Sequence, residues 1–172
     1  MLRTTMILAA VAGMATVRAD DDKKPPADAP YSDATFVKEA GCCYAAVMQS
    51  CELATTNAKS QAVKALAARI KEDHKKTADE WMKAAEKTGV AAKPALDEEH
   101  QKCLTKLKGL EGAAFDKEFL AETIKGHEMA VKKFKQASKM TKNDAVKEFA
   151  ADTLPILEKH LDIARKVQAD GK

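Results

Sequence analysis

Apolar side chains recur every three or four residues along almost the whole chain after residue 31, and this spacing is the strongest constraint on its fold. It is the period of a helix with one buried face, and no segment alternates apolar and polar residues as a strand would. The same part of the chain holds six glycines and two prolines, so few positions interrupt a helix. The sequence therefore predicts an all-α protein, a four-helix bundle with a helix-containing connection between helices two and three.

The limits of these helices follow from capping residues and from the apolar pattern. The four main helices are predicted over residues 32–59, 60–88, 115–140 and 142–169, with a short helix over 96–108 in the connection. Ser32 or Asp33 is the expected N-cap of the first helix, and Gly89 ends the second. Pro155 should kink the fourth helix because it removes a backbone donor. The buried stripe of the first helix is expected to comprise Phe36, Ala40, Cys43, Val47, Cys51 or Ser50, and Ala54.

The N-terminus has the composition of an export signal. Arg3 precedes an apolar run from Met6 to Val17, and the run ends in a small-x-small pattern at residues 17–19. The run is too short to cross a bilayer, which takes about 20 residues. We therefore predict a signal peptide over residues 1–19, a disordered leader over 20–31 and a bundle domain over 32–170. Cleavage between Ala19 and Asp20 would make the protein periplasmic or secreted, with no transmembrane segment in the mature chain.

The charge balance excludes one large class of function. The chain has 29 basic and 26 acidic residues, and removal of Arg3 and Arg18 leaves 27 against 26. Aromatic residues make up only 5% of the chain. Nucleic-acid binding requires a basic surface, and single strands also require stacking rings. We therefore expect no nucleic-acid partner.

All four histidines fall on predicted apolar stripes, and none falls on a charged face. Imidazoles that face one another from neighbouring helices are a common way for bundles to bind metal. The alternative is that each histidine is a hydrogen-bonded core residue. The candidate metal ligands are His74, His127, His160, His100 and Cys103, and zinc or copper is the candidate ion.

Counting residues from the predicted turns ranks these candidates. His74 and His127 lie at similar depths, 15 and 14 residues from the turns near Lys59 and Thr141. His160 lies 19 residues beyond Thr141, an offset of about five residues or roughly 7–8 Å from His127 at helical rise. The count therefore favours His74 with His127, places His160 next, and disfavours one ion bound by both His127 and His160. His100 is expected to contribute from the connection.

Two other kinds of chemistry have weaker support. A di-iron carboxylate centre needs Glu-x-x-His motifs, and no histidine here has a glutamate three residues before it. Exported proteins form disulfides, but Cys42, Cys43 and Cys51 share one helix, so any bridge would join Cys103 to one of these three. The absence of a C-x-x-C motif leaves thioredoxin-like redox chemistry without support.

Several segments resemble a known family. They are "LATTNAKSQAVKALAARIKEDH" at 53–74, "LDEEHQKCLTKLKGLEGAAFD" at 96–116, "HEMAVKKF" at 127–134 and "TLPILEKHLDIA" at 153–164. Together they are similar to the ferritin-like domain-of-unknown-function family 4142, whose members are exported bacterial proteins often labelled membrane or outer-membrane proteins. The resemblance implies a ferritin-like four-helix fold and export, and it implies no activity.

Two positions depart from the family pattern. Family members carry a glycine pair and then an inward glutamate in helix one, where this chain has Cys43, Tyr44 and then Val47. The family's aspartate before the third-helix histidine is Gly126 here. If the family's histidines and glutamate form a polar centre, this chain lacks the carboxylate from helix one.

Three functions are consistent with these observations. The first is a non-enzymatic exported bundle protein, with envelope stress as one candidate role. The second is a protein that binds or buffers zinc or copper through its inward histidines. The third, a thiol-dependent enzyme at Cys42 and Cys43, is disfavoured because no sequence neighbour would lower the pKa of either thiol.

Overall fold

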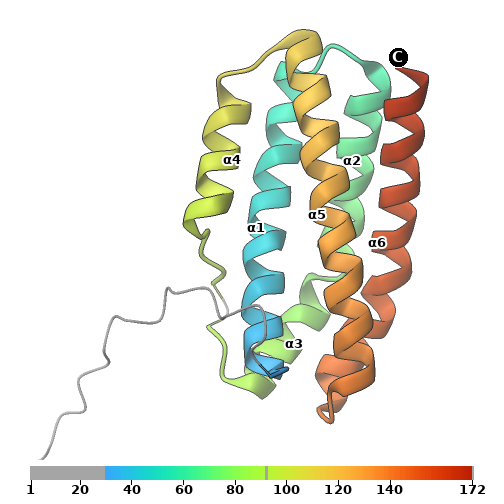
Figure 1. Cartoon of the computed structure of the whole chain (residues 1–172). Coiled ribbons are helices and arrows are strands. Elements are labelled where there is room, and N and C mark those ends of the chain that lie inside the picture. Colours follow the sequence, from blue (N-terminus) through green and yellow to red (C-terminus); the bar gives the residue numbers. More distant parts are fainter. Residues whose placement is uncertain (1–29, 92, 172) are drawn as a thin grey trace, which may run out of the picture.

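The structure is a computed structural model that describes residues 30–91 and 93–171, and the predicted signal peptide lies outside this range. The described part forms six helices and no strand. They are α1 (Asp33–Asn57), α2 (Gln61–Lys76), α3 (Ala78–Thr88), α4 (Glu98–Lys108), α5 (Gly112–Met140) and α6 (Asp144–Asp170). Figure 1 shows α1, α2, α5 and α6 side by side, with α3 below α2 and α4 on the outside, against α1 and α5. The predicted all-α bundle with a helix in its connection is confirmed.

The second helix differs from its prediction, because the expected single helix over 60–88 is two helices. The break falls at Thr77, whose φ of −91° and ψ of 0° depart from helical values. The Thr77 hydroxyl donates to the His74 carbonyl at 3.2 Å, a local bond that competes with the backbone ladder. The break lets α3 contact both α1 and α6. By contrast, α6 continues through Pro155.

The helix ends agree with the capping residues in the sequence to within a few positions. Ser32 Oγ accepts the Thr35 N–H at 3.4 Å and caps α1, as predicted. Gly89 ends α3 in the left-handed conformation, with φ of 70°. Asp97 caps α4 by accepting the His100 N–H at 2.9 Å, so this helix begins at Glu98.

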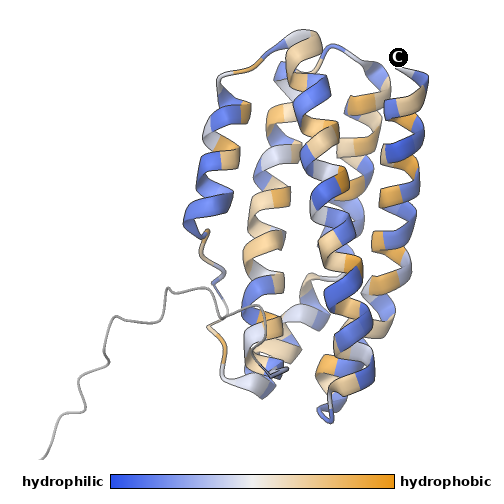
Figure 2. Cartoon of the chain, viewed as in Figure 1, coloured by the Kyte–Doolittle hydropathy of each residue, from blue (hydrophilic) through white to orange (hydrophobic). Residues whose placement is uncertain are grey.

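Two apolar clusters fill the two ends of the bundle. One joins the later part of α1 to α2 and to the start of α5, with Leu66 and Phe115 fully buried. The other joins the start of α1 to α3 and to the start of α6, around Phe36 and Phe149. In Figure 2 the apolar surfaces of the helices face one another and the hydrophilic surfaces point outward. The two clusters hold the helices together at both ends of the bundle, and this fixes the side chains that lie between the clusters.

Helix α1 is rotated relative to the predicted stripe. It buries Gly41, Cys42 and Ala46, whereas Cys43 and Val47 are half-buried. The reason is the ring of Trp81, because a Cβ added at Gly41 would lie 2.5 Å from that ring. The Trp81 indole N–H also donates to the Val37 carbonyl at 3.0 Å. Only a glycine on this face lets α3 pack so closely against α1.

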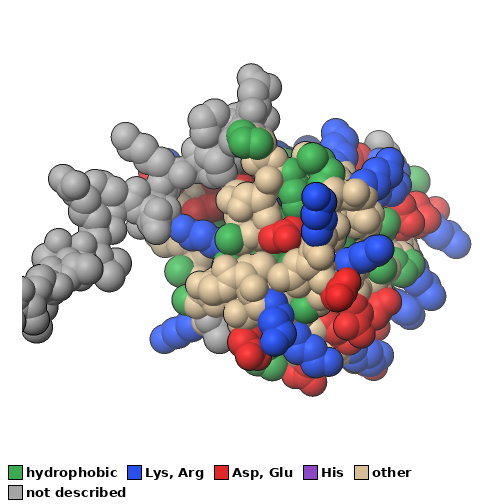
Figure 3. Space-filling model, turned by 90° about the horizontal axis from the view of Figure 1, so that it is seen from below, with side chains coloured by type: hydrophobic (Ala, Val, Ile, Leu, Met, Phe, Trp, Pro, Cys, Tyr) green, Lys and Arg blue, Asp and Glu red, His purple; other side chains and the backbone are tan. Residues whose placement is uncertain are grey.

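The surface carries mixed charge. Figure 3 shows basic and acidic side chains interspersed on the face seen from below. Among the described helices, none combines the length and hydropathy that a bilayer-spanning segment needs.

Candidate metal centre

A layer of polar side chains separates the two apolar clusters, with one residue from each main helix. His74 follows the α2 part of the first cluster, and His127 and His160 lie between the α5 and α6 parts of the two clusters. Tyr44 of α1 completes the layer, with its ring centroid 6.1 Å from that of His74. We call these four residues the histidine layer.

The three imidazoles of this layer are in mutual contact. The ring centroids are 5.5 Å apart for His74 and His160, 5.4 Å for His127 and His160, and 6.2 Å for His74 and His127. The expected proximity of His74 and His127 is confirmed. The axial offset of about five residues predicted between His127 and His160 was too large, since their rings are in contact.

The error arose from counting the turn as part of the helices. Helix α5 ends at Met140 and α6 begins at Asp144. His127 is therefore 13 residues before one end (140 − 127) and His160 is 16 after the other (160 − 144). A difference of three residues is about 4.5 Å at helical rise, which long side chains can span.

Hydrogen bonds fix which nitrogen of each ring carries the proton. His74 Nδ1–H donates to the Ile70 carbonyl at 2.9 Å, and His127 Nδ1–H donates to the Thr123 carbonyl at 2.8 Å. A carbonyl can only accept, so the lone pair of each ring is on Nε2. His160 is reversed: its Nε2–H donates to Asp73 Oδ2 at 3.2 Å, which leaves the lone pair on Nδ1.

Two of these lone pairs have no partner. His127 Nε2 and His160 Nδ1 are buried, and neither forms a hydrogen bond within the described residues. Their side chains are 3% and 0% exposed, so bulk water does not compensate for the missing bonds. Buried polar atoms without partners are rare in native proteins and call for an explanation such as a bound ion or water.

Burial also keeps the rings neutral. Desolvation is the main cause that lowers the pKa of His74, His127 and His160 from 6.5 to about 4 each. Repulsion from a neighbouring histidine contributes to each shift, whereas Asp73 opposes it at His160. Neutral imidazole is the form that binds metal, so the layer is in its ligand form at neutral pH.

Asp73 links the layer to the surface. Burial opposes its ionisation, but hydrogen bonds from His160 and Lys76 and the charge of Arg69 outweigh burial and lower its pKa. Arg69 Nε lies 3.3 Å from Asp73 Oδ2. A carboxylate that accepts the second N–H of a histidine orients the ring and increases its strength as a ligand.

His100 and Cys103 lie outside this layer, so the expectation that His100 contributes to the same centre was wrong. His100 contacts Cys42, Cys43 and Asp97 at the junction of α4 with α1. Cys103 packs against the first apolar cluster and faces Glu122, and burial and this carboxylate raise the pKa of its thiol to about 11. Connection helices are difficult to place from sequence because their position depends on the bundle surface they cover.

All four cysteines belong to the described part of the chain, and all four are free thiols in the structure. The pairing of Cys103 that a disulfide would require is therefore not present in this structure. Burial raises the pKa of Cys43 to about 11 and that of Cys51 to about 12, and it also raises the pKa of Cys42. These shifts disfavour thiolate formation and so weigh against a thiol enzyme.

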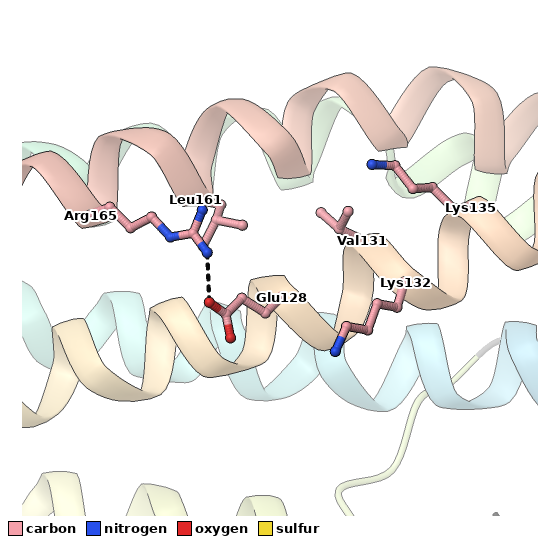
Figure 4. A pocket seen from close by; sticks show the side chains of 6 residues that line it. All are labelled: Glu128, Val131, Lys132, Lys135, Leu161 and Arg165. Carbon is pink, nitrogen blue, oxygen red and sulfur yellow. Dashed lines mark hydrogen bonds and ion pairs between the residues drawn. The ribbon is translucent and has the colours of Figure 1, made fainter.

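A surface groove lies away from the histidine layer. A groove of about 440 Å³ lies between α5 and α6, lined by Val131, Leu161 and charged side chains. The ion pair between Arg165 and Glu128, 2.7 Å long, crosses it, as Figure 4 shows. None of the four histidines lines this groove.

The sequence did not predict that Tyr44 and Asp73 lie beside the three histidines. It also did not predict that Cys42 and Asp97 contact His100. Asp73 precedes a candidate ligand directly, and Asp97 is the N-cap three residues before His100, so both had a local signal. No local signal marked Cys42 as a neighbour of His100, because the two residues are 58 positions apart in the sequence.

Comparison with known proteins identifies the family. The sequence profile of "Domain of unknown function (DUF4142)" matches residues 18–167, and the chain belongs to this family. The description of the family states no activity. No curated protein matches the chain.

Solved structures share the fold. The Cu(I)-bound form of CopM is 18% identical, with a TM-score of 0.67 over 82% of this chain and 98% of CopM. The Cu(II)-bound form has a TM-score of 0.69 over 83% and 99% at the same 18% identity. A DUF305 fragment from Deinococcus radiodurans is 14% identical, with a TM-score of 0.69 over 80% and 95%. At these identities the similarity shows the helical-bundle fold alone.

Proposed function

We propose that this DUF4142 protein binds a transition-metal ion, of the zinc or copper class, in the histidine layer and acts in metal binding or buffering rather than in catalysis. The main support is the pair of buried lone pairs on His127 Nε2 and His160 Nδ1, which have no partner among the described residues. Imidazole nitrogen is a preferred ligand of both zinc and copper.

The spacing of the three ring centroids, though not the present orientation of the rings, is close to the spacing that an ion between them requires. In a tetrahedral site, three imidazole centroids about 3.2 Å from the ion would lie about 5 Å from one another. The observed separations of 5.4–6.2 Å exceed that value slightly. The ligand nitrogens of the three rings are not all within 4.8 Å of one another in the described structure. The rings would therefore have to turn and approach one another to share one ion.

The structural neighbours add support of a general kind. CopM, which has the same fold, has been solved in Cu(I)-, Cu(II)- and silver-bound forms. The proposal for this chain uses its own histidines, since 18% identity does not transfer ligands. Export to the periplasm or outside the cell remains part of the proposal, as it rests on residues outside the described range.

Thermal unfolding of the metal-free, reduced protein with added zinc or cuprous ion tests the proposal. An ion at 100 times its dissociation constant stabilises the native state by about 2.7 kcal/mol, or roughly 5–10 °C in Tm for a domain of this size. We expect His127→Leu to reduce this response by the part that the histidine layer contributes, because it restores an apolar stripe and removes a ligand.

Thr153→Val is the matched control. This change also makes a buried polar residue of the bundle interior apolar, but Thr153 lies two helical turns from His160. We expect it to keep the full response to metal. A wild-type protein whose Tm is unmoved by either ion and by a chelator would refute metal binding in the histidine layer.

A further inference from the structure

A second cluster of ligand groups lies where α4 crosses α1. Cys42 Sγ is 3.4 Å from His100 Nδ1, and His100 Nδ1 is 2.7 Å from Asp97 Oδ1. Within the described part of the chain, these three residues are the only group of three or more His, Cys, Asp or Glu whose ligand atoms all lie within 4.8 Å. The cluster is separate from the histidine layer, since it shares no residue with it.

Local structure preorganises two of the three groups. Asp97 is the N-cap of α4, and its Oδ1 accepts the His100 backbone N–H at 2.9 Å, so the carboxylate and the imidazole leave the same turn. Cys42 approaches from α1, and its sulfur accepts the Asp97 backbone N–H at 3.4 Å. The thiol is therefore tied to the same helix end before any ion binds.

The distances match those of a tetrahedral zinc site. With Zn–S of about 2.3 Å and Zn–N of about 2.0–2.1 Å, the sulfur and nitrogen lie about 3.5 Å apart. The observed separation of Cys42 Sγ and His100 Nδ1 is 3.4 Å. The contact between Asp97 and His100 is at hydrogen-bond length and must lengthen to about 3.4 Å as the ion replaces the proton on Nδ1.

The combination of ligands selects the ion. Thiolate favours zinc and cuprous ions, imidazole suits zinc and copper, and carboxylate disfavours the soft cuprous ion, so zinc accepts all three. Three protein ligands leave a fourth position open. Because the side chains of Asp97 and His100 are 55% and 29% exposed, an ion can enter from solvent, and water can fill that position.

We propose that Cys42, Asp97 and His100 form a second, solvent-accessible site for zinc, which fastens α4 to α1. Cys43 is not a ligand of this ion, because its sulfur lies 3.7 Å from Nε2, on the opposite edge of the His100 ring. Binding releases the Cys42 thiol proton to solvent, and the neutral His100 ring moves its single proton from Nδ1 to Nε2, so one proton leaves for each ion bound by the neutral groups.

Cobalt, which takes the place of zinc and reports thiolate coordination by an ultraviolet charge-transfer band, tests the site. We expect the metal-free, reduced full chain to develop this band with Co²⁺ and to lose it on addition of Zn²⁺. Cys42→Ser should lose the band and weaken zinc binding to this site at least about tenfold, as measured by competition with a chromophoric chelator. Asp97→Asn keeps an N-cap and its folding, and should also weaken zinc binding at least about tenfold.

Control variants separate this site from cobalt binding by another thiol or by the histidine layer. Cys43→Ser and Cys103→Ser should both retain the band, since neither thiol belongs to the ligand set. His127→Leu should retain it too, so failure of the histidine layer to bind metal would leave this test intact. A band that persists in Cys42→Ser, disappears in Cys43→Ser or never forms in the wild-type protein would overturn the proposal.

Discussion

The three imidazoles of the histidine layer should make the stability of this protein depend steeply on pH between 7 and 5. In the native state the pKa of His74, His127 and His160 is lowered to about 4, against 6.5 in the unfolded chain. Between these two values the unfolded chain binds more protons, so the free energy of unfolding falls as pH falls. Above pH 6.5 the rings are neutral in both states, and their effect on stability no longer changes.

The size of the effect follows from the shift. A lowering of 2.5 pKa units corresponds to about 3.4 kcal/mol per histidine in full, of which about 2 kcal/mol is lost between pH 7 and pH 5. Three independent rings would lose about 6 kcal/mol, an upper bound because rings in contact titrate together. The pKa of Asp73 is lowered below 3.8, so its contribution to stability is lost only at a pH below 5.

Comparison of the wild-type protein with His127→Leu isolates the contribution of one histidine to the pH dependence of stability. At pH 7 the variant loses one hydrogen bond and should be destabilised by at most about 1–2 kcal/mol. At pH 5 the wild-type protein loses about 2 kcal/mol through His127 that the variant does not. The variant should then equal or exceed wild-type stability.

Urea unfolding with chelator present, followed by circular dichroism at pH 7, 6 and 5, measures this difference. Thr153→Val is the control, because it removes a buried polar group that does not titrate, and its pH dependence should match that of the wild-type protein. If the free energy of unfolding fell equally with pH in His127→Leu and in the wild-type protein, His127 would not be held neutral by burial, and the reasoning would fail.

Four further outcomes are expected. Gly41→Ala should lower the free energy of unfolding by about 1–3 kcal/mol in urea titrations, because its Cβ would meet the Trp81 ring. Thr153→Val should leave stability at pH 7 unchanged or raise it, since the hydroxyl it removes is buried and has no hydrogen-bond partner among the described residues. Mass spectrometry of exported material should give a chain that starts at Asp20, and an intact N-terminus in the membrane fraction would contradict cleavage after Ala19. Aerobic loading with ferrous iron should give no ferroxidase turnover, because the chain has no Glu-x-x-His motif.

Local features of the sequence were sufficient to predict the helices and most of their ends. The apolar period depends only on neighbours within one or two turns, and so do caps such as Ser32 and Gly89. The same period placed His74, His127 and His160 on buried faces before their contacts were known. The break at Thr77 was missed because a threonine inside a helix interrupts it only when packing favours the bent arrangement.

Only the tertiary structure decided which polar residues meet. The helical period determines the face on which a residue lies, but the axial offset between helices depends on turn geometry and on side-chain packing across the bundle. His160 therefore joined His127, and Tyr44 joined the layer, through contacts that no local pattern encodes. His100 met Cys42 for the same reason, because the position of α4 is determined by the surface of α1 and α5 that it covers.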